Sequence, residues 1–366
     1  MLLPVSGGID STLINCIVNK YKTEQYPAYY IQFGSVDSEQ FFAKEAIKNT
    51  KAELDICIMN ASDLVDTFEY QAGILDSPIG EPSSIPLAFF FKQDKYKNYT
   101  VLDGTLADSC YGAKNYSKEL FHGIKQRGKT RQVLNELLAG ALQKYNLKGQ
   151  EKFYPRDAQI EDDFLKFLNV YIGPLSRVFF PKSNEYNKII EPLWLWYYNL
   201  MNIENLNPTD AEWAKYTILK MIGYASRITT AKVEDLCGNN NIEYPFIWKE
   251  ILDDQAKYSW KDKTQNNIIK FPLKEILSNY KSKDFIFRKK VGLNNAVPQW
   301  ALESLNKKYL LDILIKNNTI IEDLIGKNNL SNLVKNFKSN NIHPNVVNLV
   351  ISLCSLQKWC DANFVR

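Results

Sequence analysis

The sequence predicts an α/β fold: a parallel sheet with helices on both faces, followed by a mainly helical C-terminal part. Short apolar segments alternate with helical patterns from the N-terminus to residue 102. Several of these segments run directly into polar or glycine-rich turns, and helical spacing dominates the chain from residue 131 onward. Strands that alternate with helices are typical of parallel sheets, because a crossover helix returns the chain to the start of the next strand.

The elements of the predicted sheet follow one another along the first part of the chain. We expect strands at residues 1–5, 29–33, 54–59 and 100–102, and helices at residues 11–19 and 38–50. In the first of these helices, Leu13, Ile14, Ile17 and Val18 form an apolar stripe. Ligands on parallel sheets bind at the carboxyl ends of the strands, so a site is expected in the turns that follow them.

The C-terminal part is predicted from the 3.6-residue spacing of its apolar side chains. Helices are expected at residues 130–145, 162–171, 212–222, 300–324 and 344–364, and residues 237–270 are expected to be irregular and polar. A chain of 366 residues accommodates two domains. We place their boundary between residues 130 and 131, so that residues 1–130 form the α/β domain and residues 131–366 form a helical part that completes the site.

Composition argues against several classes of protein. The formal net charge of +4 is too small to indicate nucleic-acid binding by itself. Six cysteines without a Cys-x-x-Cys pair, and only two histidines, argue against a structural zinc site and a disulfide framework, so we expect a cytoplasmic setting. No run approaches the roughly 18 consecutive apolar residues of a membrane span, so no membrane partner is expected.

The turn after the first predicted strand has the composition of a polyphosphate site. Residues 6–12 read SGGIDST and connect the strand to a helix. Two glycines let the backbone approach phosphate oxygens, and the helix N-terminus offers N–H groups and the positive end of its dipole. Asp10 suits such a site if it carries Mg²⁺ that bridges phosphate oxygens. The loop lacks the lysine of the Gly-x-x-x-x-Gly-Lys-Ser/Thr motif, so it predicts ATP binding by a different kind of loop.

This heptapeptide resembles the pyrophosphate loop (PP-loop) of the ATP pyrophosphatase superfamily, in which ATP is split into AMP and pyrophosphate. Further segments resemble the synthetase domain of asparagine synthetases, in the family's order: residues 75–86 (LDSPIGEPSSIP), residues 102–112 (LDGTLADSCYG), residues 244–248 (YPFIW) and residues 288–293 (RKKVGL) with Pro298 and Trp300. The resemblance implies the fold of the adenine nucleotide alpha hydrolases, with ATP and Mg²⁺ as cofactors.

The resemblance also implies a role for each matching residue. The pyrophosphate part of ATP would be bound by Ser6, Gly7, Gly8, Asp10 and Ser11. Asp10 and Asp108 would share Mg²⁺, and Gly104 would lie beside the nucleotide and the substrate. Lys290 would reach the α-phosphate and stabilise negative charge that develops in the transition state. Phe33 closes the strand whose backbone would line the adenine.

The chain departs from the family pattern mostly on the side of the acceptor. Thr105 stands where the family has a glutamate, Glu243 where it has an arginine, and Trp248 where it has an aspartate. Threonine cannot act as a general base at neutral pH, so the resemblance implies that ATP activation persists while the carboxylate substrate is not aspartate. Replacements for the missing base are Tyr111, Asp103 and Glu191.

The predicted function is therefore that of an ATP-dependent ligase. It would activate a small-molecule or peptide carboxylate as an acyl-adenylate, release pyrophosphate and form an amide. The chain begins inside the first strand, so nitrogen would come from free ammonia, a separate glutaminase subunit or an amine substrate, unless the start is truncated. Two alternatives stay open: a tRNA-modifying PP-loop enzyme, favoured by the basic residues 125–131, and a catalytically weakened ATP-binding partner subunit.

Overall fold

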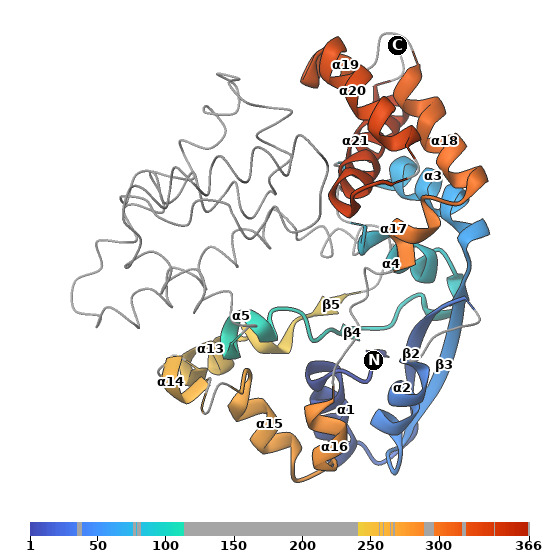
Figure 1. Ribbon diagram of the computed structural model, residues 1–366. Helices are drawn as coiled ribbons and strands as arrows, with labels where there is room; N and C mark the ends of the chain where they lie inside the picture. The colour runs from blue at the N-terminus through green and yellow to red at the C-terminus, as the bar shows by residue number, and fades with distance from the viewer. Residues whose placement is uncertain are drawn as a thin grey trace, which may run out of the picture. The chain divides into compact units, whose positions relative to one another are not determined.

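Figure 1 shows the computed structural model, which describes residues 1–34, 39–75, 78, 82–112, 241–255, 257–258, 260–263, 265, 268–288, 296–316, 320–339 and 341–364. The chain divides into two compact units. The first comprises Met1–Ala113, Lys220–Asn317 and Ile351–Arg366, and the second comprises Lys114–Leu219 and Asn318–Val350. The predicted domain boundary between residues 130 and 131 lies outside the described residues.

The first unit is built on parallel strands, as predicted. Its strands are β1 (Leu3–Pro4), β2 (Tyr26–Phe33), β3 (Ala52–Met59), β4 (Val101–Leu102) and β5 (Ile242–Glu243). All the pairings are parallel: β1 with β2, β2 with β3, and β4 with β5. A parallel bridge between Leu2 and Val101 joins the two groups, so the strands lie in the spatial order β3-β2-β1-β4-β5.

The sequence of β2 explains its place between β1 and β3. The strand pairs with β3 along its whole length, from Tyr26 beside Ala52 to Phe33 beside Met59. Most of its side chains are buried on both faces, which is the pattern of a parallel strand covered by helices. Tyr29 of β2 stacks on Phe90, with ring centroids 3.8 Å apart. The strand is therefore a rigid support for the turns at its carboxyl end.

Helices connect and cover these strands. Along the first part of the chain they are α1 (Ile9–Tyr21), α2 (Gln40–Ile47), α3 (Leu64–Ile74), α4 (Ser84–Phe91) and α5 (Ala107–Tyr111), with short 3-10 turns at Ala61–Asp63 and Asp94–Tyr96. A buried polar link ties three of the elements together. Asn15 of α1 donates to the Ala46 carbonyl of α2 at 3.3 Å, and the Tyr26 hydroxyl of β2 donates to Asn15 Oδ1 at 2.9 Å.

The region expected to be irregular, residues 237–270, contains regular elements where it is described. These are β5, a 3-10 turn at Pro245–Ile247, α13 (Lys249–Gln255) and α14 (Trp260–Lys263), followed by α15 (Phe271–Leu277) and α16 (Lys283–Phe287). Helix α15 packs beside α1 (Figure 1) and adds Leu273 and Leu277 to the core around the sheet. The prediction failed here because short, polar elements gain their stability from tertiary contacts, which periodicity does not reveal.

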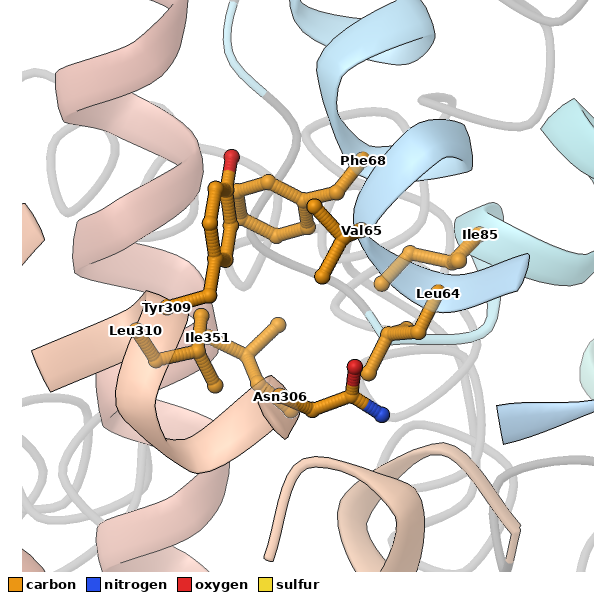
Figure 2. Close-up of a pocket in the computed structure, with 8 residues that line it drawn as sticks. All are labelled: Leu64, Val65, Phe68, Ile85, Asn306, Tyr309, Leu310 and Ile351. Atoms are coloured by element: carbon orange, nitrogen blue, oxygen red, sulfur yellow. The ribbon is translucent and has the colours of Figure 1, made fainter. Parts of the chain in front are cut away.

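The described part of the first unit also contains three later helices, and the last two of them contribute to an apolar pocket. They are α17 (Ala296–Trp300), α18 (Ser304–Ile315) and the part of α21 (Pro344–Asn363) from Ile351 onward. Figure 2 shows the pocket lined by Leu64, Val65, Phe68, Ile85, Asn306, Tyr309, Leu310 and Ile351. The Asn306 side chain donates to the Ala61 and Trp300 carbonyls, and the Tyr309 hydroxyl donates to Glu69. We interpret the pocket as a packing gap between helices.

In the second unit, the described residues form α19 (Ile320–Ile325), α20 (Lys327–Lys338) and the start of α21. Helices α19 and α20 contact each other across Gly326, and α20 buries Leu330, Leu333 and Phe337. The predicted helices at the C-terminus are thus confirmed, although the one expected at residues 300–324 is divided between α18 and α19. Within the described part of the chain, no helix is both long and apolar enough to cross a membrane.

Candidate functional site

The order of the strands marks one place on the sheet. From β1 the chain proceeds to β2 and β3 on one side, and it then returns to add β4 and β5 on the other side. In open parallel sheets, the carboxyl ends of the two strands at such a reversal diverge and leave room for a ligand. The turn after β1 is the predicted phosphate loop, and the turn after β4 begins with Asp103 and Gly104. These two turns therefore meet where the topology predicts a site.

The phosphate loop is a compact turn in which hydroxyl groups gather. Ser11 Oγ accepts from the Ser6 N–H at 3.2 Å and lies 3.2 Å from Ser6 Oγ. The Gly8 N–H points at Ser6 Oγ at 3.4 Å, and Gly8 is the N-cap of α1 without a side-chain cap. The loop thus collects hydroxyls, a backbone N–H and a helix N-terminus, the donors that suit a polyphosphate.

Two glycines allow close contacts of the phosphate loop, one with α2 and one with the turn after β4. Gly7 has a φ of 67°, and a Cβ there would lie 2.6 Å from the backbone carbon of Phe42 in α2. A Cβ on Gly104 would lie 3.0 Å from the Cβ of Asp10 and 3.2 Å from the Ser11 nitrogen. Gly104 therefore rests directly on the phosphate loop. A larger residue at either position would force the neighbouring chain away. The atoms that its Cβ would meet are backbone or Cβ atoms, which cannot move aside by rotation of a side chain.

A buried lysine joins the two turns electrostatically. Lys270 Nζ donates to Asp10 Oδ1 at 2.7 Å and Oδ2 at 2.6 Å, and it also forms an ion pair with Asp108. Its side chain is 10% exposed, against 23% for Asp10 and 47% for Asp108. Burial disfavours the charged form of Lys270, but the two carboxylates outweigh it and raise the pKa of Lys270 above its ordinary value. Lys270 is therefore an ammonium ion at neutral pH.

The backbone is strained at Lys270 and at Leu106, two residues before Asp108. Among the described residues, four non-glycine residues have positive φ: Asn49, Asn98, Leu106 and Lys270. Asparagine tolerates this region, whereas leucine and lysine rarely adopt it. Leu106, with a φ of 72°, is the N-cap of α5, which carries Asp108, and Lys270, with a φ of 54°, is the N-cap of α15. Strain of this kind concentrates at functional sites, which supports a site here.

The same residues fit a divalent cation. Asp10 and Asp108 already share one positive charge, so their carboxylates are close enough to serve a single cation. In the described residues, no three His, Cys, Asp or Glu side chains form a metal site. A Mg²⁺ ion at these two carboxylates would therefore need further oxygen ligands, which phosphates and water supply in nucleotide sites.

The other predicted site residues fall into two groups. Phe33 ends β2 and contacts the ring of Trp300 in α17, with centroids 5.6 Å apart. Lys290, Glu191 and the basic residues 125–131 lie outside the described residues. The structure thus brings together Ser6, Gly7, Gly8, Asp10 and Ser11 with Gly104 and Asp108.

The departures from the family pattern also have definite environments. The Trp248 indole N–H donates to Glu243 Oε2 at 3.0 Å, so two of the altered positions contact each other. The Thr105 N–H donates to Asp103 Oδ1 at 2.7 Å, which makes a local turn after β4. Burial raises the pKa of Tyr111 to about 12, and the phenol therefore stays protonated at neutral pH. A protonated phenol is a poor base, which argues against Tyr111 in this role, and Asp103 stays a predicted replacement.

Comparison with known proteins shows the family of the chain. A family model described as asparagine synthase matches residues 3–361. The chain belongs to the asparagine synthase family. It is 22% identical over 328 residues to asparagine synthetase (glutamine-hydrolyzing) 1 of Bacillus subtilis (strain 168), in a match that covers 83% of this chain and 47% of that protein. The chain thus spans about half the length of the curated relative that it matches.

Sequence reasoning missed Lys270, although the family resemblance was correct. The chain has 45 lysine and arginine residues, and Lys270 stands in an unremarkable stretch before Phe271 and Pro272. The one local signal is the proline in the first turn of α15, which marks a helix start and hence a turn at Lys270. Only the packing of α15 against α1 brings the ammonium to Asp10.

The role of Gly7 can be tested against a glycine of the same conformation. We expect Gly7→Ala to lower the free energy of unfolding by about 2 kcal/mol more than Gly34→Ala, because the added methyl group meets the Phe42 backbone. Gly34 has a φ of 65°, and an added Cβ there meets none of the described residues within 4 Å. Chemical denaturation of both variants measures the difference, and equal losses would show that backbone strain alone acts at Gly7.

Replacement of Lys270 should expose the cation site. We expect Lys270→Met to cost about 3 kcal/mol of stability, because it leaves two neighbouring carboxylates without their shared ammonium. Millimolar Mg²⁺ should then raise the thermal unfolding midpoint of the variant more than that of the wild type. Lys274→Met, on the same helix and half-buried, is the control and should show no added Mg²⁺ effect. An identical Mg²⁺ response in all three proteins would contradict the assignment of a cation site to Asp10 and Asp108.

Proposed function

We propose that this chain is an ATP-dependent ligase that activates a carboxylate as an acyl-adenylate and then forms an amide. In the first step a carboxylate oxygen of the substrate attacks the α-phosphorus of ATP, and pyrophosphate leaves. In the second step an amine or ammonia attacks the acyl carbon, and AMP leaves. The proposal is supported by membership of the asparagine synthase family and by the curated relative, whose name describes an asparagine synthetase.

The observation that carries the proposal is the ion pair of Asp10, Lys270 and Asp108 beside the phosphate loop. A cluster of two carboxylates and one ammonium, partly buried, has little reason to exist at the end of a sheet unless it serves a charged ligand. The loop beside it presents Ser6, Gly8 and Ser11 as donors for the pyrophosphate part of ATP. Lys270 would then exchange one of its carboxylates for a phosphate oxygen, which holds the leaving group in place.

Asp10 and Asp108 would hold Mg²⁺ when ATP is bound, and that ion would neutralise negative charge on the phosphates. The protein's own part is to keep the two carboxylates fixed on α1 and α5. Gly104 keeps α5 close to the loop, because it leaves no side chain between them. We further infer that Lys290, two residues beyond the last described residue of this segment, stabilises charge on the α-phosphate.

The substrate of the amide-forming half differs from aspartate in this proposal. Glu243 stands where the family pattern has an arginine, and Trp248 stands where it has an aspartate. The two side chains contact each other, so this position pairs an acid with a neutral donor. An acidic substrate loses a cationic partner there. We propose a small-molecule or peptide carboxylate of lower charge as the acceptor, with nitrogen from an amine substrate, free ammonia or a separate glutaminase subunit.

Pyrophosphate release tests the proposal directly. With ATP, Mg²⁺ and pools of carboxylates and amines, the wild type should release pyrophosphate only when an acceptor is present. Asp10→Asn should lower this rate by at least about 100-fold, because it removes charge at the phosphates but keeps the side-chain shape. Asp66→Asn is the matched control, since Asp66 also lies in the first turn of a helix but is exposed and pairs with Lys92.

The outcomes separate the proposed function from its rivals. Binding of ATP without release in any pool would support the weakened partner subunit instead. Release that depends on added tRNA would favour the tRNA-modifying alternative. An equal rate in wild type and Asp10→Asn would show that the phosphate loop does not act in the reaction.

A further inference from the structure

A second cation, 18 residues after Lys270 in the sequence, also contacts the phosphate loop. Arg288 follows α16 directly, and its guanidinium donates to both carboxylate oxygens of Glu39, at 2.9 and 2.6 Å. The same Nη2 atom donates to the Gly7 carbonyl at 3.0 Å. The side chains of Arg288 and Glu39 are 9% and 13% exposed. The guanidinium also lies over the Phe42 ring, 3.8 Å from its centroid.

The contact with Gly7 fixes one peptide group of the loop. No peptide bond among the described residues is cis, so the Gly7 carbonyl and the Gly8 N–H point in opposite directions from one planar unit. Arg288 lies on the carbonyl side, and the Gly8 N–H therefore points toward Ser6 Oγ and the interior of the loop. Two adjacent glycines tolerate the reversed orientation of this peptide, which would present a carbonyl oxygen to the phosphates. The arginine holds the orientation that suits an anion.

The geometry of the guanidinium is suited to this task. A planar fork with five N–H donors can bind a carboxylate with two bonds and still reach a carbonyl, whereas a lysine ammonium acts as a point charge. Lys281, in the same segment, makes a different contact: it donates to the Glu45 and Lys48 carbonyls at the end of α2. The two cations therefore hold opposite ends of α2, and of the two, Arg288 is the one that contacts the loop.

We propose that Arg288 is a positioning residue of the phosphate loop: it sets the orientation of the Gly7–Gly8 peptide and thereby the affinity of the loop for phosphates. Glu39 orients the guanidinium, and Phe42 supports its face. This inference rests on the proposed function, since it assigns Arg288 to the same ATP site. It concerns a residue that does not touch the reacting atoms.

Binding and hydrogen exchange together test the proposal. Arg288→Lys keeps the charge opposite Glu39 and loses the fork, so it should weaken binding of ATP with Mg²⁺, and of pyrophosphate with Mg²⁺, by about 10-fold. Binding of adenosine should stay unchanged, because the loop faces phosphates. Amide exchange in residues 6–12 should become faster. Lys281→Met is the matched control: it should lower the unfolding midpoint and leave all three affinities and the exchange of the loop unchanged.

The results separate failure of this proposal from failure of the proposed function. Equal pyrophosphate affinity in wild type and Arg288→Lys would overturn the proposal, as would an equal weakening of adenosine, which would indicate a merely structural role. Unchanged amide exchange in residues 6–12 would overturn it whether or not ATP binds. A wild type that binds neither ATP nor pyrophosphate would instead overturn the proposed function, while the exchange measurement would still decide whether Arg288 orients the loop.

Discussion

The ammonium of Lys270 between two carboxylates is the interaction on which the rest of the site depends. Asp10 belongs to the turn after β1, and Asp108 follows β4, so their charges would repel each other where the two turns meet. Lys270 is brought from a distant part of the chain and turns that repulsion into attraction. Burial of the Lys270 ammonium is tolerated because both carboxylates pair with it, and loss of the lysine would leave their charges uncompensated.

One segment of the chain, residues 270–288, supplies the cations that contact the phosphate loop and α2. Lys270 donates to Asp10 in the phosphate loop, and Lys281 donates to carbonyls at the end of α2. Arg288 pairs with Glu39 at the start of α2 and donates to the Gly7 carbonyl. Leu273 and Leu277 hold the segment against the core. The N-terminal loop contains the glycines and hydroxyls of a nucleotide site, but its shape is fixed by cations that occur more than 250 residues later. The loop and this segment therefore form one functional unit.

Much of the fold followed from the sequence, because strands and the longer helices carry strong apolar patterns. Strands β2, β3 and β4 and helices α1, α2 and α21 lie where periodicity predicts them. The phosphate loop could be predicted because its glycines and polar residues have a local physical meaning. The partners of the loop were not predictable in this way: Lys270 and Arg288 owe their roles to the packing of α15 and α16, and strand β5 is too short to carry a periodic signal. The family resemblance identified the order of the motifs but not these contacts.

Binding of α,β-methylene ATP, an analogue that cannot release pyrophosphate, tests the central claim most directly. Calorimetry with and without Mg²⁺, in the wild type and in Asp108→Asn, shows whether the paired carboxylates serve a nucleotide-bound cation. We expect Mg²⁺ to strengthen binding to the wild type by at least about 10-fold, which corresponds to about 1.4 kcal/mol, and to have little effect on Asp108→Asn. Binding that is independent of Mg²⁺, or that responds equally to Mg²⁺ in both proteins, would contradict the account.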